Sequence, residues 1–203
     1  MLKEHFHPTK ETLIRTVVHL LSEKSADQLS SDEVLELSGI SKGSMYHHFE
    51  DFSDLIEHAL VARFAGFVDQ SIELLTTILN QSKSRTQMLE GIKDVTRFTQ
   101  SEKLKSQRLE RVSAIAKAGH SARMNQNLRI EQERLTEALA DLFREVRNRG
   151  WGNPDLDPTT VSVLIQAYTM GKIVNDYADT PMDPDKWIFL IDTLLEKVIF
   201  LPE

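Results

Sequence analysis

Several side chains that can hydrogen-bond to nucleic acid lie within one short stretch of the sequence. Lys42 has an ammonium group that can reach a guanine edge or a phosphate, and the hydroxyl of Ser44 can contact either kind of acceptor. Gly43 lies between them and has no side chain, so the backbone can approach DNA closely at this point. These residue types and their spacing predict a surface that reads DNA.

Two short helices are required to position these residues. Ser30 and Glu33 form a capping box, in which the hydroxyl and the carboxylate satisfy free amides of a first helical turn. Gly39 favours the left-handed backbone that ends a helix, and Ser41 is a suitable N-cap for a second helix over about 42–48. This pattern predicts a helix-turn-helix, whose second helix lies in the DNA major groove.

The motif resembles the N-terminal domain of the TetR family of one-component transcriptional repressors. The resemblance extends from Thr9 to Leu60, and the rest of the chain agrees with the family only in its helical layout. It depends on these residues, in register with the preceding capped helix: Gly39, Ile40, Ser41, Gly43, Ser44, Met45, Tyr46, His48, Phe49, Asp54 and Leu55.

The resemblance implies DNA contacts at the start of the first three helices. Tyr46 and His47 are expected to face phosphates, with core packing as the alternative for Tyr46. Phe49 is expected to lie in the core, and His48 to support the following helix. The complete set of expected DNA-binding residues is Thr9, Ser30, Ser31, Ser41, Lys42, Gly43, Ser44, Tyr46 and His47.

The charge balance is unusual for a DNA-binding protein. Of 203 residues, 24 are Lys or Arg and 31 are Asp or Glu, and residues 1–64 contain six basic against eleven acidic residues. Lys and Arg usually supply most of the non-specific affinity for DNA. Phe52 occupies a position where the family commonly has a phosphate-contacting lysine. Binding must therefore use amides, hydroxyls and histidines, and six of the seven histidines fall in residues 1–64.

Two other function classes were weighed against DNA binding. Because the N-terminal region is acidic, one alternative is a helical dimer that acts through protein contacts and has a weak or vestigial DNA-binding domain. An enzyme is disfavoured, because the sequence has no HExxH motif, no glycine-rich phosphate loop and no cysteine. No cofactor and no metal site are expected, since the adjacent His47 and His48 would point about 100° apart on a helix.

The sequence predicts neither a membrane span nor a signal peptide. No apolar run approaches the roughly 20 residues that cross a bilayer, and residues 1–10 lack the apolar core of a signal peptide. We therefore expect a cytoplasmic protein without a membrane partner.

The whole chain predicts an all-α fold of about nine helices. We expect a short arm over residues 1–8, a three-helix DNA-binding domain over residues 1–52, and an effector-binding and dimerisation domain over residues 53–203. The first helix is predicted from Thr9 to about Lys24. Asp51 caps a long fourth helix, to about Leu79, that can connect the two domains. The caps expected for the later helices are Ser84, Ser101, Ser121, Asp157 before Pro158, and Asp183 before Pro184.

The last two helices predict a homodimer. In the first of them, to about Tyr177, apolar residues surround a narrow polar stripe of Ser162, Gln166, Thr169, Lys172 and Asp176. Such a helix must be buried on two sides, against its own core and against a second subunit. The resemblance also implies this four-helix interface. The expected interface residues are Val161, Leu164, Gly171, Trp187, Ile191, Leu194 and Val198.

The same region is expected to bind an unidentified, lipophilic small-molecule effector. An effector would stabilise a spacing of the two DNA-binding domains that does not fit a palindromic operator, so effector and DNA would bind with negative coupling. Ordinary core packing is the alternative for each candidate pocket residue. These candidates are Phe67, Ile92, Val95, Phe98, Met124 and Tyr168.

Overall fold

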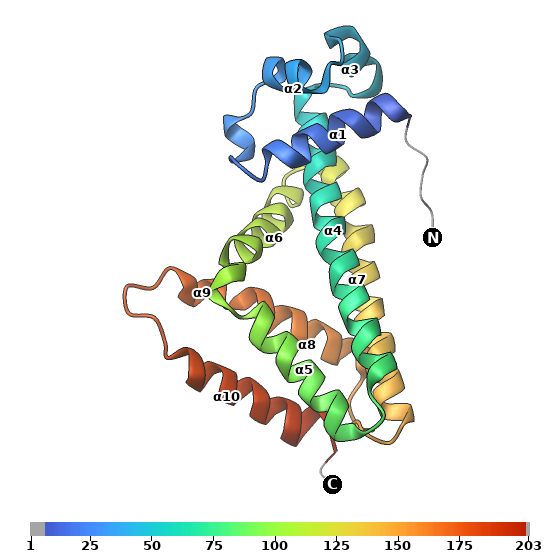
Figure 1. Cartoon of the computed structure of the whole chain (residues 1–203), viewed down its shortest axis with the longest axis vertical. Helices are drawn as coiled ribbons and strands as arrows, with labels where there is room; N and C mark the ends of the chain where they lie inside the picture. Colours follow the sequence, from blue (N-terminus) through green and yellow to red (C-terminus); the bar gives the residue numbers. More distant parts are fainter. Residues whose placement is uncertain (1–6, 202–203) are drawn as a thin grey trace.

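The computed structural model describes residues 7–201, and this part of the chain is almost entirely helical. It contains nine helices of seven residues or more and a four-residue helix, as the all-α expectation requires. Within the described range, an isolated bridge between Gly152 and Phe200 is the only β-type pairing. A small head formed by α1, α2 and α3 lies at one end of the long helix α4, and the other helices lie below it (Figure 1).

The head is a three-helix unit around its own apolar cluster. Its helices are α1 (Pro8–Leu20), α2 (Ser31–Ser38) and α3 (Lys42–His48), with a short 3-10 turn at Ala26–Gln28. Their buried side chains pack on the first turns of α4, so the head and α4 share one core. This cluster includes Leu13, Val17, Val34, Met45, Phe49, Leu55 and Ala59.

Helix α1 differs from the prediction at both ends. It begins at Pro8, and the ring nitrogen Nδ1 of His7 accepts the backbone N–H of Thr9 at 3.3 Å. Proline is favoured here because its missing N–H needs no partner in a first turn. The helix ends at Leu20 rather than near Lys24, where tighter i→i+3 bonds follow. Most of the predicted N-terminal arm lies outside the described residues.

The caps predicted for α2 and α3 are confirmed. The Ser30 Oγ accepts the N–H of Glu33 at 3.3 Å, and the Ser41 Oγ accepts the N–H of Ser44 at 3.2 Å. Gly39 ends α2 with a φ of 68°, in the left-handed region. The carboxylate of Glu33 pairs with Lys24, so the return half of the predicted capping box is replaced by a contact to the preceding turn.

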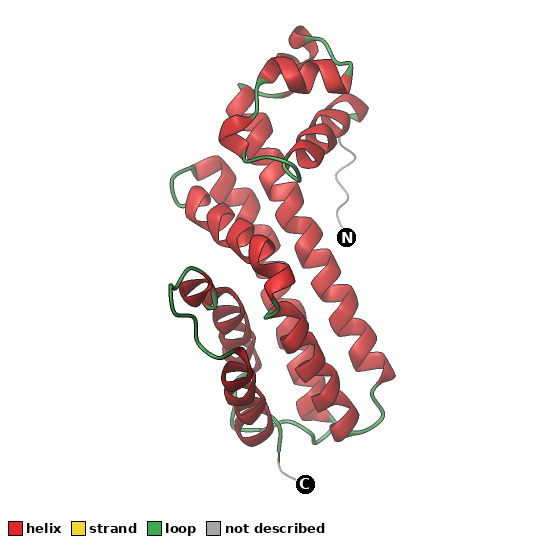
Figure 2. Cartoon of the chain, turned by 60° about the vertical axis from the view of Figure 1, so that its left-hand side comes forward, coloured by secondary structure: helices red, strands yellow, loops and turns green. Residues whose placement is uncertain are grey.

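Helix α4 (Phe52–Gln81) extends from the head to the opposite end of the molecule. Asp51 caps it as predicted, accepting the N–H of Asp54 at 2.7 Å. Its 30 residues correspond to a length of about 45 Å. Helix α7 (Ala122–Asn148) lies alongside α4 for most of this length (Figures 1 and 2). This pair is therefore the structural connection between the head and the rest of the chain.

The remaining helices build the larger, C-terminal core. They are α5 (Arg85–Thr99), α6 (Lys105–Ala118), α8 (Pro158–Gly171), α9 (Ile173–Asp176) and α10 (Pro184–Leu194), which continues as a π-helical turn over Leu195–Ile199. The predicted caps Ser84, Ser121, Asp157 and Asp183 all accept backbone N–H groups. The helix predicted from Ser101 instead begins with a 3-10 turn, Glu102–Leu104, before α6.

Candidate nucleic-acid interface and ligand cavity

One side of α3 is anchored in the head, and its other side is open to solvent. Met45 and Phe49 are almost completely buried and hold the helix against α2 and α4. The opposite side exposes Lys42, Tyr46 and His47, and 47% of the Tyr46 surface is accessible. The expected DNA-reading side chains therefore lie together on one exposed surface, with Gly43 also exposed and Ser44 half-buried.

The remaining expected DNA contacts lie at the starts of α1 and α2. Ser30 is exposed, and because its oxygen accepts a backbone N–H, its hydroxyl hydrogen is free to donate to a phosphate. Ser31 is half-buried at the first position of α2. Thr9 is half-buried in the first turn of α1, where its N–H is bound by His7. These groups supply donors without adding positive charge.

A group of histidine rings connects α1 to α3. The His48 ring lies 4.8 Å from the His7 ring and 5.1 Å from the His47 ring, measured between centroids. Loss of water contact lowers the pKa of His48, and the neighbouring His7, His47 and Lys10 lower it further. His48 therefore remains neutral to lower pH than an ordinary histidine, which suits a packing position between the two helices.

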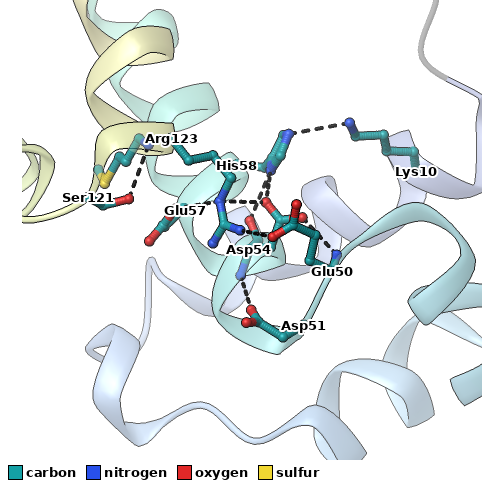
Figure 3. A network of polar contacts seen from close by, with 9 residues as sticks. Lys10, Glu50, Asp51, Asp54, Glu57, His58, Ser121 and Arg123 are labelled. Carbon is teal, nitrogen blue, oxygen red and sulfur yellow. Dashed lines mark hydrogen bonds and ion pairs between the residues drawn. The ribbon is translucent and has the colours of Figure 1, made fainter.

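Three acidic residues at the junction of the head and α4 contact α7. Arg123, in the first turn of α7, contacts three carboxylates at once (Figure 3). Its Nη1 lies 2.8 Å from Glu50, and its Nε lies 2.9 Å from Glu57 and 3.1 Å from Asp54. Burial would lower the pKa of Arg123, but these carboxylates outweigh it and raise the pKa. Arg123 thus balances part of the negative charge that counts against DNA binding.

The Arg123 contacts continue into α1. The Asp54 carboxylate also lies 3.0 Å from the ring of His58, and the other ring nitrogen of His58 is 3.3 Å from the Lys10 ammonium (Figure 3). A continuous set of polar contacts therefore joins α7, α4 and α1. Arginines on an amphipathic helix are most often solvated, but Arg123 is held by three carboxylates. Its partners are 66 to 73 residues away, so no local pattern indicates them.

A cavity lies in the C-terminal region between α4, α5, α6, α7 and α8. The space open to the centres of water-sized atoms is about 90 Å³. Ile92, Val95 and Tyr168 line it, as expected for a pocket in this region. Most other lining residues are aliphatic or carry hydroxyl groups: Ser71, Leu74, Leu75, Thr96, Thr99, Leu135, Leu139, Ile165 and Thr169.

Three candidate pocket residues do not line this cavity. Phe98 is 56% exposed, because it lies about 120° around α5 from Ile92. Met124 is fully buried about 16 Å along α7 from the lining residue Leu135, close to the head. Phe67 is half-buried one turn before the lining residue Ser71. The helical spacing of apolar residues does not by itself show which part of each helix borders the cavity.

The cavity also has three larger polar side chains, Tyr168, Gln166 and Arg111. The Tyr168 hydroxyl lies 3.3 Å from the Thr96 hydroxyl, and burial raises the pKa of Tyr168. Gln166 donates to the Thr136 hydroxyl at 3.0 Å. Arg111 was not among the candidates, because an arginine on an amphipathic helix is most often solvated.

Helix α8 has its polar side inward and part of its apolar side outward. Ser162 and Gln166 are buried and bind Thr136 of α7. After the helix breaks at Gly171, which the predicted continuous helix did not include, the buried Asp176 pairs with Arg108 at 2.9 Å. The polar stripe is thus satisfied within the chain, and an apolar face remains open.

This apolar face extends over α8, α9 and α10. We define it by these exposed residues: Val163, Leu164, Val174, Tyr177, Phe189, Leu190 and Val198. Of the expected interface residues, Leu164, Gly171 and Val198 are exposed and Trp187 and Leu194 are half-buried. Val161 and Ile191 are buried in the chain's own core, so their assignment to the interface is corrected. They lie on the inner sides of α8 and α10, which the all-round apolar pattern could not distinguish.

The described residues, 7–201, have no feature of a membrane span or of a metal site. None of their helices has the length and apolarity to span a bilayer. Residues 7–201 also contain no group of three or more His, Asp or Glu side chains placed to bind a metal ion.

The fold has many solved relatives, although neither a protein-family model nor a curated protein matches the sequence. Escherichia coli NemR in its reduced form is 16% identical, with a TM-score of 0.67 over 95% of this chain and 97% of that one. A protein assigned to the TetR family of transcriptional regulators, from Mesorhizobium loti, is 17% identical, with a TM-score of 0.65 over 91% and 92%. A regulator from Saccharomonospora viridis in complex with choline is 12% identical, with a TM-score of 0.67 over 95% and 97%. The chain therefore has the fold of the TetR-family regulators.

Proposed function

We propose that this chain, which has the TetR fold, is a dimeric transcriptional regulator that binds a DNA operator and is released from it by a small molecule. The observation that carries the proposal is the exposed side of α3, where Lys42, Tyr46 and His47 project from a helix anchored by Met45 and Phe49. An anchored helix with polar residues at its open side matches the geometry of major-groove readers. A cytoplasmic location follows from this function.

The orientation of the acidic residues favours DNA binding over the protein-contact alternative. Glu50, Asp54 and Glu57 are held by Arg123 of α7 at the junction of the head and α4. Helix α3 itself contains no Asp or Glu. A phosphate backbone at α3 therefore meets hydroxyls, amides, histidines and Lys42, and the repulsion that the overall charge suggests is reduced.

The apolar face of α8, α9 and α10 supports a homodimer. Apolar faces of this extent on a chain of this size mark association surfaces. A two-fold axis through the face would join α8 and α10 of each subunit into a four-helix interface at the end of the molecule opposite the head (Figure 1). Two heads related in this way would read a palindromic operator, with half-sites one or more turns of DNA apart.

The cavity and the head are connected in a way that supports control by an effector. Helices α4 and α7 both border the cavity. Helix α4 meets the head through its first turns, and α7 meets it through the contact of Arg123 with Glu50, just after α3. A ligand that changes the packing of α4 against α7 would tilt the head. Effector and operator would then each weaken the binding of the other by the same factor. The choline complex of the Saccharomonospora regulator supports ligand binding within this fold.

The decisive experiment is a selection of bound sequences from random duplex DNA, at low and at near-physiological salt. The effector-free protein is compared with Lys42→Ala, and with Lys83→Ala as a control because Lys83 is exposed at the end of α4 opposite the head. We expect a palindromic motif with the wild type and the control and its loss with Lys42→Ala. The salt dependence should be shallow, because few Lys or Arg contacts are available. A folded dimer that selects no motif at either salt would refute the proposal.

A further inference from the structure

Arg111 on α6 is a cation without an anion. It lines the cavity, its Nε is shielded from solvent, and that atom makes no hydrogen bond. Across residues 7–201, its guanidinium takes part in no hydrogen bond or ion pair. Its one identified contact is with the ring of Phe64, whose centroid lies 5.8 Å from the guanidinium carbon. Burial without a compensating charge lowers the pKa of Arg111.

The other charges around α6 are already paired. Arg108, one turn earlier, binds Asp176 and the backbone carbonyls of Thr99 and Ser101. Glu110, the residue before Arg111, forms a two-bond pair with Arg63 of α4, with both distances at 2.8 Å. The chain therefore satisfies its other nearby guanidinium groups with carboxylates. Arg111 is half-buried, and a cation that loses contact with water without gaining an anion is destabilising.

The cavity beside Arg111 suits a small molecule with an apolar body. No Asp or Glu lines it, and aliphatic side chains such as Leu75, Ile92 and Leu139 form most of its wall. One water-sized atom needs roughly 10–15 Å³ of this kind of space, so the cavity holds about six to nine non-hydrogen atoms. Hydroxyl groups of Thr96 and Tyr168 supply a few polar contacts.

We propose that the cavity binds a small monocarboxylate, with its carboxylate paired to Arg111 and its apolar body among the aliphatic residues. This inference deepens the proposed function, on which it rests for the role of the cavity as the effector site. The planar guanidinium can bind a carboxylate through two parallel hydrogen bonds. One cation balances one negative charge, whereas a phosphate monoester would bring excess charge into an apolar site. The expected lipophilic effector is thereby narrowed to an amphiphilic anion.

The test measures binding to the purified full chain in the absence of DNA. Benzoate and linear carboxylates of four to seven carbons are compared with benzamide, with the matching linear amides and with inorganic phosphate, by thermal unfolding and calorimetry. At least one carboxylate should raise the Tm by about 5–10 °C at a hundredfold excess over its Kd. The amide of the same shape and phosphate should leave the Tm unchanged.

Variants of Arg111 separate a ligand contact from a structural role. Arg111→Met should weaken carboxylate binding at least about tenfold, since charge-assisted pairs are the stronger ones, and should raise the Tm of the ligand-free protein because an unpaired buried charge is removed. Arg111→Lys should retain part of the binding. Arg129→Met is the matched control, because Arg129 is an exposed arginine whose pair with Glu133 is also exposed, and it should change neither property.

The result that overturns the inference is equally definite. It fails if no carboxylate shifts the Tm, if amides bind as tightly as carboxylates, or if Arg111→Met binds them with wild-type affinity. Carboxylate binding that depends on Arg111, combined with no selected DNA motif, would refute the proposed function alone. A selected motif without carboxylate binding would refute this inference alone.

Discussion

Replacing Arg123 with alanine should both destabilise the protein and disconnect the head from α7. Arg123 is one-third exposed, and its pair with the largely exposed Glu50 contributes little. Asp54 and Glu57, however, have side chains only 6% and 9% exposed. Asp54 keeps His58 as a partner. Among the described residues, the Glu57 side chain accepts a hydrogen bond from Arg123 alone, so the substitution would leave a buried carboxylate without a partner.

The cost follows from that unpaired carboxylate. A buried charged group that loses its partner costs about 2–3 kcal/mol once the partial exposure of the arginine is allowed for. In a chain of this size, that loss corresponds to a fall in Tm of about 4–12 °C. Chemical denaturation and calorimetry measure the loss. Operator binding with and without effector, followed by fluorescence anisotropy, measures the coupling, which should decrease as well.

A double-mutant cycle tests the reasoning directly. Adding Glu57→Gln to Arg123→Ala removes the stranded charge and should recover about half or more of the lost stability. Arg129→Ala serves as the control, because its pair with Glu133 is exposed and 3.5 Å long, and it should cost no more than about 0.5 kcal/mol. A loss below about 0.5 kcal/mol for Arg123→Ala, or no recovery with Glu57→Gln, would refute the assigned role of Arg123.

Three further outcomes are expected. Lys42→Ala and Tyr46→Phe should weaken operator binding, by about 1–3 kcal/mol where the lost contact is to a base, with the dimer intact in sedimentation; wild-type affinity in either variant would contradict the assigned reading surface. Because the folded pKa of His48 lies below its ordinary value, the unfolded chain binds more protons below about pH 6.5, so stability should fall as the pH is lowered through that value and below. His48→Gln should flatten this part of the profile of Tm against pH, and an unchanged slope would exclude His48 as its source. The double substitution Phe189→Glu and Leu190→Glu puts charge on the apolar face and should yield monomers in sedimentation. Circular dichroism should show that these monomers keep their helices, and a persistent dimer would place the interface elsewhere.

Local features of the fold were predictable because their chemistry is local. Ser30, Ser41 and Asp51 cap their helices through bonds to residues three positions away. Gly39 ends α2 because a left-handed backbone favours glycine. The early end of α1 was missed because no Gly or Pro marks it. The break after Gly171 was missed because an isolated glycine is often tolerated inside a helix.

Contacts between distant segments were not predictable in the same way. Arg123 and Arg111 look alike in the sequence, as arginines on amphipathic helices. Packing places three carboxylates beside Arg123 and none beside Arg111. The side of α8 that faces its own core was equally undetermined, because Val161 and Leu164 are similar in type and only three residues apart. The structure places Val161 inside and leaves Leu164 exposed.

The shortage of cations on the reading side of α3 has a consequence for the distribution of such a regulator in a cell. A chromosome offers about 10⁶–10⁹ competing non-specific sites, which retain proteins that neutralise many phosphates. Lys42 is the single Lys or Arg of α3, so little of this retention is available. More molecules would remain unbound between visits to an operator, and a small copy number would suffice to fill it. The accompanying cost is a slower approach to DNA, because the long-range attraction that accelerates association is weak.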